Sequence, residues 1–345
     1  MKLGIQGWYL AQPYTGIGQH CLGLLRELAT RHEIRVVVPV PMPMTHRGIP
    51  KHWLKVIPPK WWIPNAGLRK WYWERYQVPA FFAEANPHWE LYPYPCPLPR
   101  ISPNLRAMTV HDTILWRDER YRKGWFKQKY HRETERSLVD VDQIFAVSES
   151  TKRDLDIPAA TVIPNAVTVP VQLNKMNYEN ALVYLGGFDL RKRVPDLVKA
   201  FTAVRKKHPE MTLLLIGEAH HKSKYYPEIP DSEGVVHLGA LTDKQLYSVL
   251  KSSYAFVHFS DSEGFNLPLL QAMSVGVPVI ARDLDVNREV SGGAAKLLKN
   301  PNGKSLVDAV EYVRKHRTTM VNKQKKAAQR YSWKKSTTTL LKALK

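Results

Sequence analysis

Short apolar segments of strand length alternate with amphipathic segments of helix length along most of the chain. Runs of β-branched and aromatic residues predict buried strands, and a 3.6-residue apolar repeat between them predicts the helices that cover them. The expected strands are residues 2–8, 34–40, 107–112 and 144–148 in the first half, and 182–187, 212–217, 235–238, 254–259, 277–281 and 295–298 in the second. This alternation is typical of doubly wound α/β domains with parallel sheets.

The length of 345 residues favours two domains, because single hydrophobic cores stop growing beyond about 250–300 residues. Residues 170–180 are polar and rich in asparagine, which indicates a linker. We therefore expect one domain over residues 1–168 and another over 169–328. Two basic amphipathic helices are predicted near the end, over residues 303–330 and 332–344.

The most informative stretch is residues 254–282, which predicts a strand, a tight loop, a short helix and a second strand. Pro268 suits the first turn of that helix and Gly276 its end. The loop before it carries Glu263, and Gln271 lies about one turn into the helix. Free amides at a helix N-terminus favour an anion, so the stretch suits a ligand with phosphates and hydroxyls. Ordinary strand–loop–helix structure with a solvated Glu263 is an equally good interpretation of the spacing alone.

A basic pair, Arg191 and Lys192, lies just before a predicted helix at residues 195–207. Cations at a helix N-terminus oppose the helix dipole, and an anionic ligand would resolve that conflict. In the first half, the segment with Gly16 and Gly18 predicts a glycine-containing strand-to-helix turn, and His111 with its neighbour Asp112 ends a strand. Each of these first-half features is weak alone, since plain turns and structural histidines are common.

Residues 47–82 combine five tryptophans with seven basic residues and one acid, Glu74. Tryptophan interleaved with lysine and arginine is typical of an interfacial membrane contact, and also of a stacking surface for single-stranded nucleic acid. A core helix over residues 68–82 is the structural alternative. We favour a patch that faces a membrane or an acceptor, formed by Trp53, Lys60, Trp61, Trp62, Arg69 and Lys70.

The overall charge and composition add limited information. The formal net charge is +20, which attracts nucleic acid, anionic membranes or acidic substrates. The two cysteines, Cys21 and Cys96, form no metal or disulfide pattern, and no apolar run reaches the length of a membrane span. We expect a cytoplasmic protein, with peripheral attachment to the cytoplasmic membrane face as one option.

Several stretches together resemble the retaining glycosyltransferases of family 4, over essentially the whole chain. The matching pieces are T-G-I-G (15–18), V-H-D (110–112), F-A-V-S-E-S-T-K-R-D-L (145–155), V-I-P-N-A-V (162–167), Y-L-G-G-F-D-L-R-K (184–192), L-L-L-I-G (213–217), S-D-S-E-G-F-N-L-P-L-L-Q-A-M (260–273) and Y-S-W-K-K-S-T-T-T-L-L (331–341). The resemblance implies the GT-B fold, in which two Rossmann-like domains face each other across a cleft. It also implies an acceptor-binding first domain, a nucleotide-sugar-binding second domain, and a final helix over residues 329–345 that returns to the first domain.

The resemblance also implies roles for individual residues. Arg191 and Lys192 match the pair that neutralises the donor diphosphate, Glu263 matches a glutamate that contacts donor-sugar hydroxyls, and His111 matches a histidine beside the reacting carbon. The expected catalytic residues are therefore His111, Arg191, Lys192 and Glu263. The expected donor-binding residues are Gly16, Gly18, Gly187, Gly217, Gly264, Phe265, Asn266, Leu267 and Gln271.

Two positions depart from the family pattern. Gln271 stands where a ribose-binding glutamate is usual, and an amide lacks charge assistance for that hydrogen bond. Gly187 stands where an arginine is common, and Arg191 next to Lys192 substitutes for it in our interpretation.

The implied reaction moves a hexose-type sugar from a UDP- or GDP-sugar, with retention of configuration, to a glycan or lipid-linked acceptor in cell-surface polysaccharide or glycolipid synthesis. We expect no metal and no cofactor beyond the nucleoside diphosphate sugar as co-substrate, and Asp261 with Glu263 is not read as a metal motif. The alternatives are a nucleotide-sugar epimerase on the same fold and a non-catalytic protein that binds nucleic acid or carbohydrate. Nucleic acid is the less favoured partner, because the basic residues avoid the best-formed ligand loop.

Overall fold

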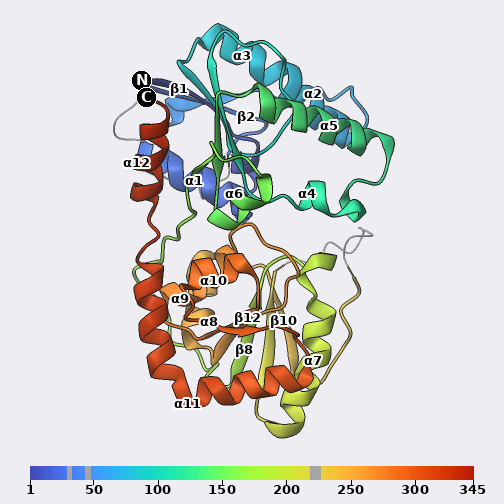
Figure 1. Ribbon diagram of the computed structural model, residues 1–345, viewed down its shortest axis with the longest axis vertical. Helices are drawn as coiled ribbons and strands as arrows, with labels where there is room; N and C mark the ends of the chain where they lie inside the picture. Colours follow the sequence, from blue (N-terminus) through green and yellow to red (C-terminus); the bar gives the residue numbers. More distant parts are fainter. Residues whose placement is uncertain (29–32, 43–47, 218–226) are drawn as a thin grey trace. The chain divides into compact units, whose positions relative to one another are not determined.

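The computed structural model describes residues 1–28, 33–42, 48–217 and 227–345 (Figure 1). The chain divides into two compact units. Unit 1 consists of Met1–Ala166 and Ser332–Lys345, and unit 2 consists of Val167–Tyr331. Each unit is described by itself below.

Unit 1 is built on a seven-stranded, all-parallel sheet with the order β3-β2-β1-β4-β5-β6-β7. The strands are β1 (Lys2–Gln6), β2 (Glu33–Val38), β3 (Leu54–Val56), β4 (Trp89–Tyr92), β5 (Leu105–Val110), β6 (Gln143–Ala146) and β7 (Thr161–Val162). The helices are α1 (Gly16–Leu28), α2 (Ala66–Tyr72), α3 (Val78–Ala85), α4 (Ile114–Arg117), α5 (Trp125–Asp140), α6 (Glu149–Leu155) and α12 (Trp333–Ala343).

Two hydrophobic cores cover the two faces of this sheet, because successive strand side chains point to opposite sides. Val36 and Val38 of β2 pack in the core under α1 and α12, whereas Val37 between them packs in the core with Trp73 and Phe82 on the other face. A continuous apolar strand is therefore required in the middle of the sheet, which explains why the strands lack a polar alternation.

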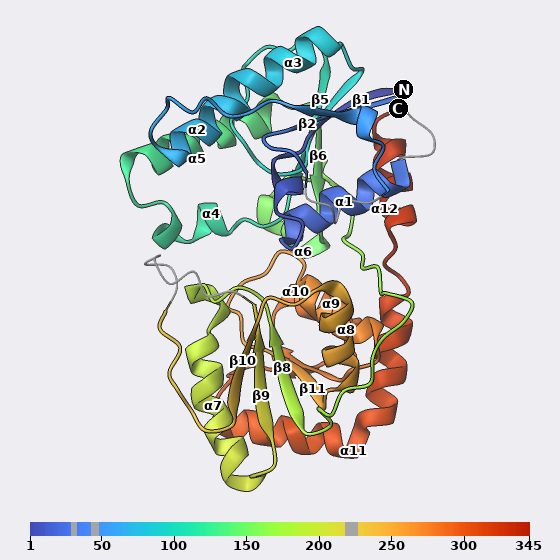
Figure 2. The same cartoon turned by 180° about the vertical axis from the view of Figure 1, so that it is seen from behind.

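Unit 2 contains a six-stranded, all-parallel sheet with the order β10-β9-β8-β11-β12-β13. The strands are β8 (Ala181–Leu185), β9 (Thr212–Ile216), β10 (Val235–Gly239), β11 (Ala255–His258), β12 (Val279–Arg282) and β13 (Lys296–Leu298). The helices are α7 (Val194–Lys207), α8 (Asp243–Ser252), α9 (Leu267–Ser274), α10 (Asp285–Ser291) and α11 (Gly303–Ala328). Figure 2 shows α7 and the strands β8, β9 and β10 from behind.

The strand order of unit 2 reverses direction between β8 and β11. In open parallel sheets, ligands bind outside the carboxyl ends of the strands at such a reversal, because the flanking loops diverge to opposite faces there. Arg191 and Lys192 follow β8, and Glu263 follows β11. The predicted basic pair and the predicted glutamate therefore lie on the two loops that border the reversal point.

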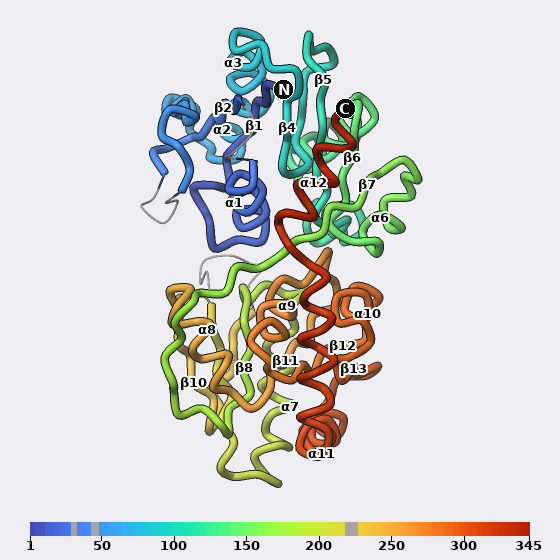
Figure 3. Tube along the Cα trace, turned by 90° about the vertical axis from the view of Figure 1, so that its left-hand side faces the viewer, coloured from blue at the N-terminus to red at the C-terminus, as the bar shows by residue number. Residues whose placement is uncertain are grey.

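The last helix of the chain belongs to unit 1. After α11 the chain leaves unit 2, and α12 packs against α1 (Figure 3). The ring of Trp333 lies directly over Gly23 of α1, and the Ser336 hydroxyl donates to the Pro164 carbonyl at 2.6 Å. The two parallel sheets and the returning helix confirm the predicted fold class.

Three differences from the sequence-based expectation affect candidate residues. Gly16 and Gly18 lie in the first turn of α1, not in the preceding loop. The predicted helix over residues 68–82 is interrupted at Trp73–Gln77 by a π-helical turn. The strand predicted at residues 107–112 ends at Val110, so His111 lies just beyond the sheet. Boundaries shift by one or two residues because end turns have little intrinsic preference of their own.

Candidate functional site

The loop after β8 is a short 3-10 turn that presents the basic pair. The Asp189 side chain caps this turn, Leu190–Lys192, by accepting from the Arg191 amide at 3.0 Å. Arg193 then adopts a left-handed conformation at φ 55°, and α7 begins at Val194. This sharp turn places Arg191 and Lys192 ahead of a helix N-terminus, as predicted from the position of Pro195.

Three hydrogen bonds tie this loop to the loop after β11. The Asp261 amide donates to the Arg191 carbonyl at 2.8 Å, and the Ser260 hydroxyl donates to the same carbonyl at 3.2 Å. In return, Nη1 of Arg191 donates to the Ser262 carbonyl at 2.7 Å. The two loops at the reversal point therefore form one connected structure.

Glu263 is the centre of a charged cluster between these loops. Its Oε1 accepts from Nζ of Lys192 at 2.6 Å and lies 3.2 Å from Nη1 of Arg191. Nε2 of His258 lies 3.5 Å from the same oxygen. All three contacts reach Oε1, and none of the three uses the second carboxylate oxygen, Oε2.

The cluster is largely withdrawn from water, with side-chain exposures of 8% for Glu263, 10% for Lys192 and 19% for Arg191. Burial alone would raise the pKa of Glu263, but the charges of Lys192 and Arg191 outweigh it and hold that pKa below its usual range. Burial, with Arg191 adding to it, lowers the pKa of Lys192 despite the attraction of Glu263. The cluster thus brings the Glu263 carboxylate together with two basic side chains, and a second carboxylate, that of Asp189, lies 3.5 Å from Nε of Arg191.

His258 is a member of this cluster that the sequence did not reveal. It lies at the end of β11, is fully buried, and stacks between the rings of Tyr184 and Phe256 with interplanar angles of 7° and 17°. Burial lowers its pKa to about 3, so the ring is neutral at physiological pH. A single histidine in an apolar strand looks like an ordinary core residue, and only its place five residues before Glu263 could have marked it.

The loop residues after Glu263 build the start of α9. Asn266 adopts a left-handed conformation at φ 63°, and its side chain caps the helix by accepting from the Leu269 amide at 3.3 Å. Phe265 and Leu267 are buried, and Phe265 packs edge-to-face on Tyr331. These two positions can therefore reach a ligand only through backbone groups.

Gln271 is 4% exposed, and its side chain hydrogen-bonds to the Tyr247 hydroxyl. Gly217 has a φ of 137°, which residues with a side chain rarely adopt. A Cβ there would lie 2.0 Å from the Gly186 carbonyl oxygen. By contrast, nothing lies within 4 Å of a Cβ placed on Gly187. Gly217 is thus required by the close approach of two strand ends, whereas Gly187 borders open space.

In unit 1, His111 follows the end of β5, and its Nε2 lies 2.8 Å from the Pro93 carbonyl. A carbonyl only accepts, so Nε2 carries the proton and Nδ1 carries the lone pair. The His20 ring lies edge-on at 4.8 Å, and its Nδ1 contacts Oδ1 of Asn165 at 2.7 Å. Burial lowers the pKa of His111 to about 3 and that of His20 to about 4, so both rings are neutral.

The amide of Gly18 is already used within unit 1, because it donates to the Thr15 hydroxyl at 3.1 Å. A Cβ on Gly18 would lie 2.3 Å from the Gln12 carbonyl oxygen. The glycine at this position is therefore explained by local packing at the start of α1.

The structure corrects the membership of the aromatic–basic patch. Trp61 and Trp62 are 84% and 59% exposed, as a surface role requires. Trp53, however, is buried in the core of unit 1. Lys70 places its ammonium group 2.6 Å from the fully buried Glu74 and 4.5 Å from the ring centre of Tyr94. Composition alone could not distinguish these inward-facing residues from outward-facing ones.

The remaining patch positions surround the start of α2. Lys60 precedes this helix and is exposed, and Arg69 lies on it and is half-buried. The start of α5 lies alongside, since a Cβ on Gly67 would contact the Phe126 ring, and this helix adds Trp125, which is 72% exposed. Arg47, which belongs to the same stretch of sequence, lies outside the described residues. We call the surface formed by Lys60, Trp61, Trp62, Arg69 and Trp125 the α2–α5 patch.

Neither a membrane span nor a metal cluster is found in the described ranges. None of the helices there is long and apolar enough to cross a membrane. Across the same ranges, no group of three or more histidine, cysteine, aspartate or glutamate side chains is placed to share a metal ion.

Comparison with known protein families matches both halves of the chain. Residues 14–169 match the family described as Glycosyltransferase Family 4, and residues 168–331 match the family described as Glycosyl transferases group 1. Together these matches run almost without interruption through both units.

Two curated relatives illustrate the sequence similarity. The O-antigen chain mannosyltransferase B of Escherichia coli is 30% identical over 154 residues, which are 42% of this chain and 39% of that protein. The poly(glycerol-phosphate) alpha-glucosyltransferase of Bacillus subtilis is 25% identical over 173 residues, which are 47% of this chain and 25% of that protein. The chain thus spans well under half the length of these relatives.

Solved structures show the same architecture at low sequence identity. Anabaena HepE in complex with UDP-glucose superimposes with a TM-score of 0.73 and 14% identity, over 100% of this chain and 99% of that one. WaaG, described as a glycosyltransferase involved in lipopolysaccharide biosynthesis, gives a TM-score of 0.72 and 12% identity, over 98% of both chains. These similarities establish the fold.

Proposed function

The chain belongs to the glycosyltransferases of family 4, and from this premise we propose that it moves a sugar from a nucleoside diphosphate sugar to a glycan or lipid-linked acceptor. The observation that supports the proposal most is the cluster of Arg191, Lys192 and Glu263 at the strand-order reversal of unit 2. It offers two cations to an anion and one carboxylate oxygen to a hydroxyl, which are the two groups that a sugar diphosphate presents side by side.

In the proposed mechanism, Arg191 and Lys192 bind the diphosphate. Breaking the bond between the sugar and the diphosphate leaves negative charge on the phosphate oxygens, and preorganised cations in a site of low exposure stabilise that charge best. The N-terminus of α7 adds its dipole to theirs. Oε2 of Glu263 accepts a hydroxyl of the sugar, while backbone groups of Gly264, Phe265 and Asn266 border the same space.

His111 of unit 1 supports the proposal through its protonation state. A neutral ring with its lone pair on Nδ1 can accept a hydrogen bond from a hydroxyl, and it carries no positive charge. We infer from the family that the sugar is transferred with retention of configuration. The anomeric configuration of the first product, measured by NMR before it equilibrates, tests that inference.

A nucleotide screen tests the proposal directly. We expect one of UDP, GDP and ADP to raise the melting temperature of the protein, because a ligand that binds only the folded state stabilises it. Lys192→Met should abolish this rise, whereas Lys199→Met, a matched change of an exposed lysine on the neighbouring helix α7, should preserve it. The proposal fails if no nucleotide raises the melting temperature, or if the Lys192 variant responds like the Lys199 variant.

The same screen identifies the nucleotide of the donor. A UDP- or GDP-hexose is the donor that we propose, since HepE is described with UDP-glucose and the relative in Escherichia coli is named a mannosyltransferase. The relatives reported above that are named by activity are transferases, so nothing in them favours an epimerase. Epimerised donor without consumption of an acceptor would be the signature of that alternative.

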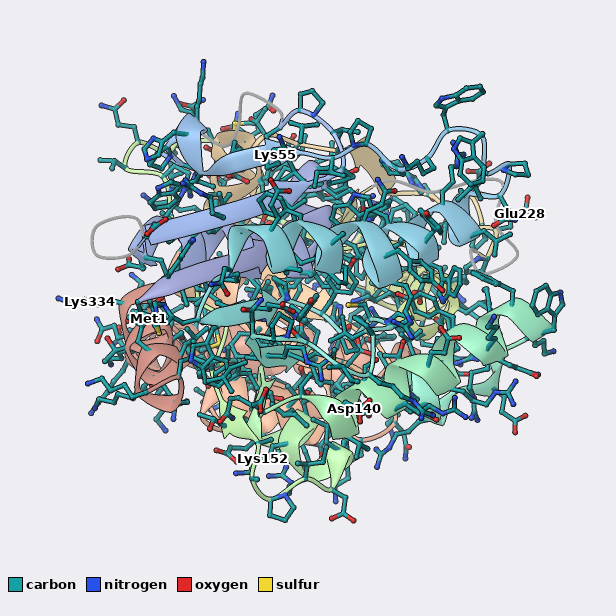
Figure 4. All side chains as sticks on the ribbon, turned by 90° about the horizontal axis from the view of Figure 1, so that it is seen from above. Met1, Lys55, Asp140, Lys152, Glu228 and Lys334 are labelled. Carbon is teal, nitrogen blue, oxygen red and sulfur yellow. The ribbon has the colours of Figure 1, made fainter. Side chains whose placement is uncertain are left out.

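We further propose that the protein acts at the cytoplasmic face of a membrane through the α2–α5 patch. Three exposed tryptophans with Lys60 and Arg69 fit the boundary between lipid headgroups and acyl chains, where rings and cations both find partners. Lys55 of the edge strand β3 adds an exposed cation in the same unit (Figure 4). A lipid-linked acceptor would be presented at such a surface.

A further inference from the structure

A chain of hydrogen bonds behind Glu263 ends at two backbone groups, which fixes the direction of every bond in it. The Leu269 amide can only donate, so the Asn266 atom that faces it at 3.3 Å is the side-chain oxygen. The Arg282 carbonyl can only accept, so the Asn287 atom that faces it at 2.8 Å is the side-chain nitrogen. Both amide orientations are therefore determined by the fold.

These orientations determine the tautomer of His258. Nδ2 of Asn266 donates one hydrogen to Oδ1 of Asn287 at 2.8 Å, and its second hydrogen faces Nδ1 of His258 at 3.4 Å. Nδ1 must then carry the lone pair of the neutral ring. The ring proton is on Nε2, the atom that lies 3.5 Å from Oε1 of Glu263.

Nε2 of His258 has no hydrogen-bond partner in the part of the chain that the structure describes. A buried N–H without a partner is destabilising, so a nearby carboxylate oxygen is its natural acceptor. The ring itself is fully buried between Tyr184 and Phe256 and cannot touch a ligand. Its effect on the site must pass through Glu263.

We propose that His258 is a positioning residue for Glu263, a neutral ring whose Nε2–H holds Oε1 while Arg191 and Lys192 bind the donor diphosphate. This inference rests on the proposed function. In the ligand-free structure the two cations hold Oε1 themselves, but a diphosphate competes for both of them. The neutral His258 ring is not drawn toward the phosphates, so its Nε2–H stays on Oε1 when Arg191 and Lys192 bind the diphosphate. Glu263 then keeps Oε2 directed at the sugar hydroxyl.

Two isosteric variants separate positioning from simple packing. His258→Gln can place an amide N–H where Nε2 lies, whereas His258→Asn places its amide where Nδ1 lies and cannot reach Glu263. We expect His258→Asn to weaken binding of UDP-glucose relative to UDP, or of GDP-mannose relative to GDP, by about tenfold or more, since a hydrogen bond to a charged group is lost. Both variants should bind the bare nucleotide with unchanged affinity. His258→Gln should also keep the difference in affinity between the nucleotide sugar and the bare nucleotide.

NMR of the unmodified protein labelled with ¹⁵N-histidine gives a readout that needs no activity. The His258 signals, assigned by their absence in His258→Gln, should show a protonated Nε2 and a bare Nδ1, and the Nε2–H signal should move when Glu263 is changed to Gln. His20 is an internal control with the opposite pattern, since its Nδ1 faces the Asn165 oxygen. A protonated Nδ1 on His258, or equal behaviour of the Asn and Gln variants toward sugar nucleotides, overturns the inference. If no nucleotide sugar binds at all, the proposed function fails, and the tautomer still decides the role of His258.

Discussion

At the scale of single residues, Glu263 is subject to two opposing effects on its ionisation. Its carboxylate is buried, which disfavours charge, yet two cations keep it ionised. The carboxylate in turn holds both cations in place, since its Oε1 lies 2.6 Å from Lys192 and 3.2 Å from Arg191. A buried ion pair of this kind contributes little net stability, but removing one partner leaves an unpaired charge and is costly. The cluster is therefore better explained by ligand binding than by folding.

Double substitution tests this explanation. Lys192→Met and Glu263→Gln should each lower sugar transfer by more than about a hundredfold, because each removes a group proposed to contact the donor. Lys192→Met should also destabilise unit 2 by roughly 3 kcal/mol, since Glu263 then keeps only the longer contacts to Arg191 and His258. The double variant should regain much of that stability in urea unfolding without regaining transfer.

The outcome is informative in either direction. Stability and transfer that recover together in the double variant would make the cluster a structural element. Near-normal transfer in either single variant would place the site elsewhere. Asp196→Asn, which alters an exposed ion pair with Arg193 in the same turn, is a matched control that should change neither quantity.

At the scale of elements, the hydrophobic pattern predicted the six strands of unit 2 and the helices α7 and α9, which carry or border the loops of the site. Arg191, Lys192 and Glu263 could be found because glycine and proline mark the loops that carry them. His258 could not, since its role depends on hydrogen bonds from Asn266 and Asn287, and the latter lies 21 residues further along the chain than Asn266. A periodic sequence pattern shows which residues share one face of a single helix or strand. Contacts between loops that follow different strands produce no periodic pattern, so the sequence does not reveal them.

The same limit explains the incorrect assignment of Trp53 and Lys70 to the surface. Trp53 ends the short 3-10 turn Lys51–Trp53 and packs in the core of unit 1, and Lys70 on α2 places its ammonium group against the buried Glu74. Neither contact follows from the composition on which the assignment rested. The start of α1 was predicted too late for a related reason. Thr15 caps the helix through its side chain, and Gly16 is then its first residue rather than part of the preceding loop.

The contact between α1 and α12 supports a prediction at this scale. A Cβ at Gly23 would lie 2.2 Å from the Trp333 ring, and the ring must move for it to fit. Gly23→Ala should therefore destabilise the packing of α12 on the rest of unit 1 by about 1–3 kcal/mol of free energy, the usual cost of overpacking. Limited proteolysis between α11 and α12 should become several-fold faster. Adding Trp333→Leu should partly restore resistance, and unchanged proteolysis in Gly23→Ala would show that this contact does not hold α12.

At the scale of the whole molecule, positive charge is in excess in both units. Unit 1 has 27 basic and 15 acidic side chains, and unit 2 has 24 and 16. Overall charge therefore attracts any polyanion and does not identify one. What distinguishes unit 1 is its exposed tryptophans, since Trp61 and Trp62 precede α2 and Trp125 begins α5, and the two helices touch near Gly67 and Phe126.

Substitution of these tryptophans tests whether the α2–α5 patch binds a membrane or a nucleic acid. Changing Trp61 and Trp62 together to Ser should lower co-sedimentation with anionic liposomes several-fold, because each ring loses its contact with the headgroup region while the net charge is unchanged. Trp125→Ser should act in the same direction. Tyr312→Ser, a matched loss of an exposed ring on α11 of unit 2, should have no effect. If the tryptophan variants still bind liposomes normally, the α2–α5 patch does not contact a membrane. If these variants lose binding to an oligonucleotide and keep binding to liposomes, the patch contacts nucleic acid.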